Sequence, residues 1–64
     1  MPKFQIVTTD GDSHVDGESR RFVVFETAET LQEFVYDGDY VELRYSGGIK
    51  VSIPEAQIAY IVTT

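Results

Sequence analysis

Apolar and polar positions alternate most clearly in residues 41–53, on both sides of a short segment at residues 46–48. If that segment is a three-residue turn, the flanking strands place every apolar side chain on one face, because side chains alternate sides along a strand. The expected cross-strand pairs are Val41 with Ile53, Leu43 with Val51 and Tyr45 with Ile49 on the apolar face, and Glu42 with Ser52 and Arg44 with Lys50 on the polar face. The pattern therefore predicts a β-hairpin and its register.

Two further segments before this hairpin are typical of strands. Residues 3–9 alternate, with Phe4, Ile6 and Thr8 on one side, and they predict a first strand. Residues 20–26 contain four consecutive apolar residues, which would supply both faces of a strand. Such a run suits a central strand that is covered on both sides, so we expect the second strand here.

Residues 27–36 change period and predict a short helix. Their apolar members are spaced to form one stripe: Ala28, Leu31, Phe34 and Val35. Thr30 followed by Glu33 fits a capping box, and Thr27 is an alternative N-cap one turn earlier. Gly38, in the sequence Asp37-Gly38-Asp39, is expected to end the helix, since glycine takes up left-handed backbone geometry easily.

The chain after the hairpin predicts one helical turn and a last strand near the hairpin. Pro54 lacks an amide donor and stops the preceding strand, and residues 54–57 can form a single turn of helix. Residues 58–62 are again strand-like. The expected class is α+β but mostly β, with five short antiparallel strands in the order ββαβββ. We expect a strongly bent sheet or an SH3-like small barrel. The closing stretch, in which a strand, a helical turn and the strand at residues 58–62 follow one another, is similar to the end of Sm-like and other small barrels.

Length and composition indicate one small domain, residues 1–64, of limited stability. A chain of 64 residues buries only about 60% of the surface that it exposes when unfolded, and it contains no cysteine for a disulfide. Good packing or self-association must then stabilise it. Residues 10–19 are rich in glycine, serine and carboxylates, and they are expected to form a mobile acidic loop.

The net charge of −6 repels a phosphate backbone and lowers the expectation of nucleic-acid binding. The N-terminal residues do not resemble a signal peptide, and no apolar run approaches the ~20 residues that span a bilayer. We expect a cytoplasmic protein without membrane contact.

The acidic segment contains the only group of residues with the chemistry of a metal or acid–base site. Its ligand-type side chains at alternate positions are Asp10, Asp12, His14 and Asp16. The first two match the start of a calcium loop, but Val15 and Arg21 stand where such a loop needs glycine and glutamate. His14 is the only histidine, and a flexible loop is a poor scaffold for acid–base catalysis. We therefore expect no enzymatic activity, no metal and no cofactor.

On this basis we expect the chain to bind a protein partner, including a second copy, with the acidic loop and the outer face of the hairpin as recognition surfaces. Aromatic residues beside arginine are enriched in such interfaces. The predicted partner-binding residues are Tyr36, Tyr40, Glu42, Arg44, Lys50 and Tyr60. We expect the three tyrosines to be at least partly exposed.

A sharper version of this function is an acidic inhibitor or adaptor that imitates nucleic acid and blocks a nucleic-acid-binding protein. It would need its carboxylates arranged in rows, and the candidates are Asp10, Asp12, Asp16, Glu18, Asp37 and Asp39. The alternative function is a small-barrel nucleic-acid binder, which would use the strip formed by Arg20, Arg21, Tyr40, Arg44 and Lys50.

Overall fold

The computed structural model describes residues 1–64, most of which lie in β-strands. The seven strands are β1 (Phe4–Thr8), β2 (Ser13–Val15), β3 (Ser19–Phe22), β4 (Thr27–Asp37), β5 (Tyr40–Tyr45), β6 (Lys50–Pro54) and β7 (Ile58–Thr63). Three 3-10 turns separate some of them: η1 (Val23–Phe25), η2 (Ser46–Gly48) and η3 (Glu55–Gln57). The mostly β class is confirmed, but the prediction of five strands with one helix is wrong. No helix is long and apolar enough to cross a membrane.

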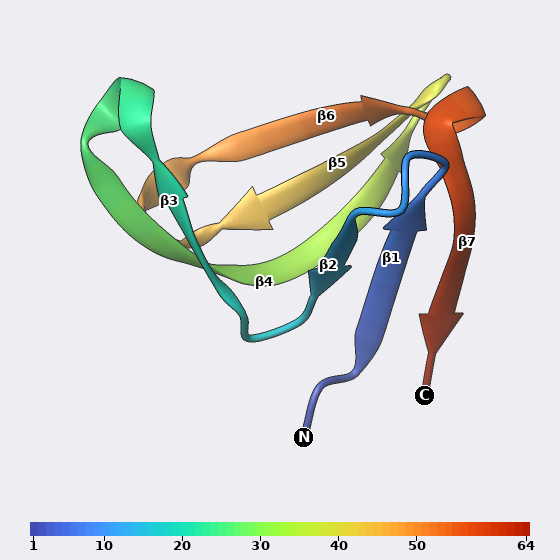
Figure 1. The fold of residues 1–64 in the computed structure, drawn as a ribbon, viewed down its shortest axis with the longest axis horizontal. Coiled ribbons are helices and arrows are strands. Elements are labelled where there is room, and N and C mark those ends of the chain that lie inside the picture. Colours follow the sequence, from blue (N-terminus) through green and yellow to red (C-terminus); the bar gives the residue numbers. More distant parts are fainter.

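The strands form two antiparallel sheets (Figure 1). The terminal sheet has the order β2-β1-β7, and the hairpin sheet has the order β3-β4-β5-β6. The hairpin sheet curls into a half-barrel around the terminal sheet, mainly through the long, bent strand β4 (Figure 1).

The predicted register of the β5–β6 hairpin is confirmed. Val41 pairs with Ile53 and Leu43 with Val51, while Arg44 lies opposite Lys50. The amide of Tyr45 donates a 2.8 Å hydrogen bond to the carbonyl of Ile49, which closes the turn at residues 46–48. The alternation of the sequence was sufficient here because a register slip of one residue would expose the whole apolar set.

The predicted helix at residues 27–36 is instead part of the 11-residue strand β4. A β-bulge between Leu31 and Glu33 adds one residue to this strand relative to β5. Leu31 and Phe34, three positions apart, therefore face the same side of the sheet, opposite Tyr45 and Leu43 of β5. The bulge thus produces a three-residue spacing that looks helical in the sequence. Tertiary pairing decided between two structures that the local pattern fits equally well.

Gly38 has a different role from the predicted helix stop. It has a φ of +61° and begins the two-residue turn between Asp37 and Tyr40, which pair across the β4–β5 hairpin. A glycine with positive φ at the first turn position is what a type II′ hairpin turn requires. Glycine followed by aspartate between two strand-like runs is a hairpin signal, and Gly38-Asp39 could have replaced the helix prediction.

The predicted central strand at residues 20–26 is also wrong. Strand β3 ends at Phe22 and lies at the edge of the hairpin sheet, paired only with β4. Residues 23–25 leave the sheet as η1 and are exposed. A run of apolar residues predicts burial only if other elements cover both of its faces, and this small fold has no second layer there.

The terminal strands pair with each other, so β7 lies beside β1 and not beside the hairpin. The acidic segment at residues 10–19 contains strand β2, which pairs with β1 through His14 opposite Ile6. The chain then passes from one sheet to the other at Gly17, whose φ is +84° and whose amide donates to the carbonyl of Leu31. The expected mobility of this segment remains a prediction.

One core joins the two sheets. Its seven buried apolar residues are Phe4, Ile6, Leu31, Val41, Leu43, Tyr45 and Ile53. The inward side chains of β1 are those that alternation predicted, including buried Thr8. An edge-to-face contact between Phe4 and Phe34, with ring centroids 4.8 Å apart, links the sheets. So small a core agrees with the limited stability expected from the chain length.

Candidate interaction surfaces

The outer face of the β5–β6 hairpin carries the charged part of the predicted partner-binding set. Arg44 donates from Nε to Glu42 at 2.7 Å and from Nη1 to Glu33 at 2.9 Å. These hydrogen bonds, with Glu42 first, raise the pKa of the Arg44 guanidinium. Lys50 faces Arg44 across the hairpin, and the ion pair of Arg44 with Glu42 offsets the repulsion between these like charges. The charges on this face are thus largely satisfied within the molecule.

The predicted tyrosines are exposed, but the structure does not bring them together. Tyr36, Tyr40 and Tyr60 have exposed fractions of 67%, 48% and 55%. Tyr40 shares the outer face of β5 with Glu42, whereas Tyr36 pairs with Val41 on the opposite, inward side of that sheet. Tyr60 belongs to β7 in the other sheet. The expected exposure is confirmed, and the six predicted residues lie on more than one surface.

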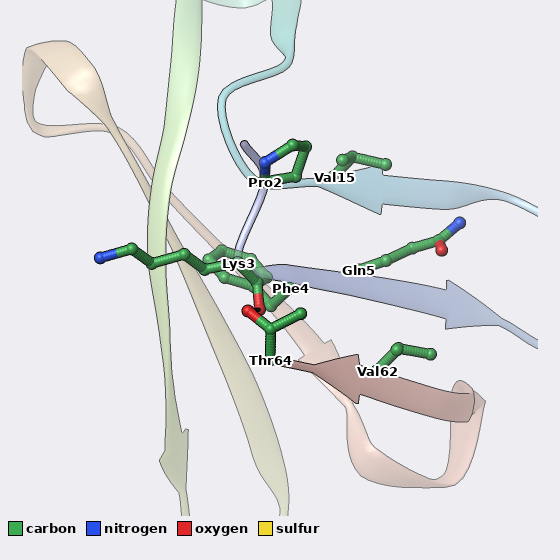
Figure 2. A pocket seen from close by; sticks show the side chains of 7 residues that line it. All are labelled: Pro2, Lys3, Phe4, Gln5, Val15, Val62 and Thr64. Carbon is green, nitrogen blue, oxygen red and sulfur yellow. Dashed lines mark hydrogen bonds between the residues drawn. The ribbon is translucent and has the colours of Figure 1, made fainter.

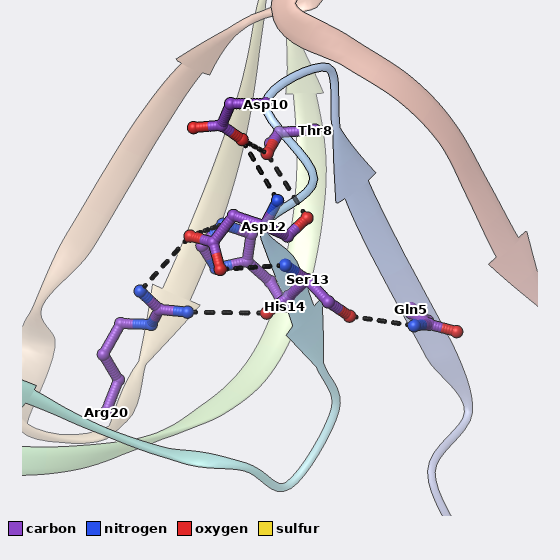
Figure 3. Close-up of polar contacts among 7 residues, drawn as sticks. All are labelled: Gln5, Thr8, Asp10, Asp12, Ser13, His14 and Arg20. Atoms are coloured by element: carbon purple, nitrogen blue, oxygen red, sulfur yellow. Dashed lines mark hydrogen bonds and ion pairs between the residues drawn. The ribbon is translucent and has the colours of Figure 1, made fainter.

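The residues of the predicted basic strip are distributed over several strands and partly neutralised. Arg20 lies 3.6 Å from a carboxylate oxygen of Asp12 and donates to the carbonyl of Ser13 at 3.4 Å (Figure 3). Arg21 follows it on the opposite side of edge strand β3. Arg44 is occupied by glutamates, as described above. Two of the three arginines therefore already contact carboxylates.

The acidic segment arranges its carboxylates around its own backbone. The hydroxyl of Thr8 and the amide of Asp12 both donate to Asp10, which lowers the pKa of the Asp10 carboxyl (Figure 3). Asp16 lies at the other end of β2, where it accepts a 3.0 Å hydrogen bond from the amide of Lys3. The structure contains no group of three or more His, Cys, Asp or Glu side chains that could hold a metal ion. The four ligand-type residues are thus not brought to one point.

His14 is the buried member of this segment. Its side chain is only 8% exposed, its Nε2 lies 3.5 Å from Asp12, and its Nδ1 is buried without a hydrogen-bond partner. Burial lowers the pKa of the imidazole, and the positive charge of Arg20 adds to this effect, while Asp12 opposes it. His14 therefore favours the neutral form. Sequence reasoning placed it on a mobile loop and missed that it pairs with Ile6 on the inner side of the terminal sheet.

The residues of η1 form an apolar tip at one end of the molecule. Val23, Val24 and Phe25 have exposed fractions of 77%, 87% and 63%. Glu26 closes the turn in a left-handed conformation with a φ of +55°, and its amide donates to the carbonyl of Val23 at 3.1 Å. The neighbouring pair between Phe22 and Thr27 joins both ends of the tip to the sheet. The tip projects away from the terminal sheet (Figure 1).

The outer face of the terminal sheet is a second surface, on which Lys3 is the one charged residue that lines the pocket. Gln5 lies between Val15 on β2 and Val62 on β7, and these side chains line an open pocket of about 280 Å³ (Figure 2). Two residues along, Val7 lies between Ser13 and Tyr60. The remaining residues that line the pocket are Pro2, Lys3, Phe4 and Thr64. The signal in the sequence was that the exposed side of β1 and β7 carries apolar residues as well, namely Val7, Tyr60 and Val62.

The carboxylates proposed for nucleic-acid mimicry are divided between the two ends of the terminal sheet. Asp10 and Asp12 lie in the β1–β2 turn, where the amide of Thr9 donates to the carbonyl of Gln57 in η3. Asp37, at the end of β4, and Asp39 flank Gly38 in the β4–β5 turn, where the carbonyl of Asp39 accepts from the amide of Glu55 in η3. Asp16 and Glu18 lie at the far end of β2. The six residues therefore do not form one continuous row.

Comparisons of the chain with protein-family models, with curated proteins and with solved structures found no match.

Proposed function

We propose that this chain is a non-enzymatic protein-interaction module, built as an SH3-like small barrel, that binds a protein partner through the apolar tip at Val23, Val24 and Phe25. The observation that carries the proposal is the exposure of these three consecutive side chains in a chain that has only seven buried apolar residues. Fully burying a Val or Phe side chain is worth about 1.5–3 kcal/mol. A partner with an apolar pocket would recover that free energy.

The geometry of the tip favours binding over an accidental exposure. Its backbone is held by the Glu26 to Val23 hydrogen bond and by the strand pair on either side, so little conformational entropy is lost on docking. The left-handed backbone of a non-glycine residue such as Glu26 carries strain, and such strain is concentrated at functional sites. Thr27 and Ser46 both donate to the carboxylate of Glu29, which supports the strand behind the tip.

We do not propose a catalytic function, because the only imidazole, that of His14, is buried with its Nδ1 unpaired. General acid–base catalysis needs a titrating group within hydrogen-bond reach of a substrate. His14 faces the core and favours its neutral form, which suits a structural role.

Nucleic-acid binding through Arg20, Arg21, Tyr40, Arg44 and Lys50 has less support. Phosphate contacts depend on cations that can exchange counterions for phosphates. Arg44 already contacts two carboxylates, and Arg20 contacts Asp12. The net charge of −6 opposes the approach of a polyanion as well.

The test compares variants of two exposed aromatic positions. Purified wild type, Phe25→Ser and the control Tyr40→Ser would be immobilised and used to capture proteins from the native host, followed by affinity measurement with the identified partner. Both substitutions are at exposed sites and should change the free energy of unfolding by no more than about 0.5 kcal/mol. We expect the partner to bind wild type and Tyr40→Ser, with at least about tenfold weaker binding to Phe25→Ser.

Two results would contradict the proposal. One is equal retention of every captured protein by wild type and Phe25→Ser. The other is binding of labelled oligonucleotides at low salt that weakens steeply as salt rises, which would favour the nucleic-acid alternative.

A further inference from the structure

The four edge strands of the two sheets differ in how well they are protected against pairing with another chain. Strand β2 is only three residues long, β3 carries adjacent Arg20 and Arg21, and β6 contains Lys50 and ends at Pro54. Short edges, charges and proline are the usual means by which proteins prevent edge-to-edge pairing. Strand β7 has six residues, Ile58–Thr63, with no charge, proline or glycine. It pairs only with β1, and no strand lies on its other side (Figure 1).

The backbone phase of β7 can be read from its hydrogen bonds. The amide of Thr64 donates to the carbonyl of Lys3 at 3.0 Å, so the main-chain groups of Thr64 point towards the β1 side. Because these groups alternate along an antiparallel strand, those of Thr63 and Ile61 point towards the free edge. The N–H and C=O groups of Ile61 are thus available to another strand.

Apolar side chains surround this edge on both faces. On the inner face, Tyr36, Val41, Ile58 and Ile61 line an open hollow of about 340 Å³ together with Glu55. On the outer face lie Tyr60 and Val62, which are 55% and 48% exposed. An added strand would cover both groups.

We propose that β7 pairs antiparallel with β7 of a second copy of this chain, with Ile61 on the two-fold axis. In that register Ile61 exchanges backbone hydrogen bonds with its own counterpart, and Tyr60 of each copy lies opposite Val62 of the other. Aromatic and β-branched residues form favourable cross-strand pairs. The two-fold axis produces this pair twice, and the interface is closed, so association stops at the dimer.

The charge distribution favours a second copy in this antiparallel arrangement. The carboxylate-bearing turns with Asp10, Asp39 and Glu55 lie near the Ile58 end of β7, so antiparallel pairing places the two acidic ends at opposite ends of the dimer. Lys3, whose backbone contacts Thr64 at the other end, would lie towards Glu55 of the second copy. A chain with a net charge of −6 can therefore self-associate here without bringing its carboxylates together. This surface is separate from the apolar tip, so the two proposals stand or fall independently.

The decisive experiment uses two double variants that replace the same two side chains of β7, Tyr60 and Val62, and differ only in the charge introduced at residue 62. Y60K/V62K places lysine opposite lysine twice in the proposed dimer, whereas Y60K/V62E places lysine opposite glutamate twice. Sedimentation velocity over a dilution series would give the dissociation constants, with circular dichroism to verify folding and Val15→Lys, on the opposite edge of the same sheet, as the control.

We expect a concentration-dependent dimer for wild type and Val15→Lys, a dissociation constant raised at least about tenfold for Y60K/V62K, and recovery of dimer for Y60K/V62E. Registers centred on Tyr60 or Val62 would place like charges opposite each other in Y60K/V62E and predict no recovery.

Thr63→Pro removes an outward N–H and should weaken the dimer without unfolding the monomer. A wild-type monomer up to about millimolar concentration, or equal dissociation constants for the two double variants, would overturn the proposal.

Discussion

The outer faces of the two sheets differ in how many of their side chains already have partners within the molecule. On the outer face of the hairpin sheet, Arg44 forms ion pairs with Glu42 and Glu33. Most charges of this face are therefore already paired within the molecule. On the terminal sheet, Tyr60 and Val62 are about half exposed, and Lys3 is the one charged residue that lines the pocket beside Val62. A charged face looks like a recognition surface in a sequence, but its charges can pair with one another. The outer face of the terminal sheet has no such network of ion pairs, which makes it the better candidate for association.

The two sheets bury one common core, and Leu43→Ala is the substitution expected to disrupt that core most. Leu43 is fully buried between them, and its truncation should cost about 2–5 kcal/mol, enough to unfold much of so small a domain. Urea denaturation followed by circular dichroism would measure the loss, with Val62→Ala on the outer face expected to stay within about 0.5 kcal/mol. Two separate transitions in wild type would show that the sheets are independent, against expectation.

The turn at residues 46–48 tests how firmly the hydrogen bonds of Glu29 hold its carboxylate in the hairpin sheet. Gly47 and Gly48 both have positive φ, of +73° and +77°, but only at Gly47 would an added Cβ meet another group, 2.8 Å from the Glu29 carboxylate. We expect Gly48→Ala to cost about 1–2 kcal/mol through backbone strain alone and Gly47→Ala to cost more. Thermal unfolding of the two variants measures the difference. Equal costs would mean that Glu29 moves aside freely despite its hydrogen bonds to Thr27 and Ser46.

Mild acid should destabilise the whole fold through the terminal sheet, because that sheet contains the buried His14. The pKa of His14 is lowered in the folded state, chiefly by burial, so below about pH 6.5 the unfolded chain binds more protons than the folded one. Its contribution to stability is therefore complete above that pH and is lost as the pH falls towards the folded-state pKa. Unfolding free energies measured between pH 7.5 and pH 5 should show a decline that His14→Phe diminishes. An unchanged decline in His14→Phe would assign it to other groups.

The smallest expected effect is that of removing the charge network from the hairpin face. Arg44→Met keeps the aliphatic stem and removes both ion pairs, of which the pair with Glu33 is exposed and the pair with Glu42 is partly buried. We expect a slight fall in melting temperature at low salt that disappears at high salt. A large fall that persists at high salt would mean that packing of the guanidinium, and not charge, stabilises this face.

Strict alternation allowed part of the fold to be predicted. The β5–β6 register and the inward side of β1 follow from alternation, because any other register would expose Leu43 or Ile6. The single turn before β7 follows from Pro54. In β4 the bulge beside Leu31 imitates a helical spacing, so local pattern alone could not distinguish strand from helix.

The candidate sites were less predictable than the strands. Exposure of Tyr36, Tyr40 and Tyr60 was expected from their number, yet their separation over different surfaces depends on the topology. The apolar run at residues 22–25 predicts a covered strand, but residues 23–25 are exposed, because such a run carries no information about whether another element will cover it.

The inward orientation of Phe4, Ile6 and the apolar hairpin residues follows from the order of residues along the chain, because alternation is a local property of the strand. The pairing of β1 with β7, the exposure of residues 23–25 and the free edge of β7 follow from contacts between distant segments. These depend on which distant segments meet, and hydrogen bonds between strands can form with almost any partner sequence. The surfaces available for binding are those that this small set of pairings left over.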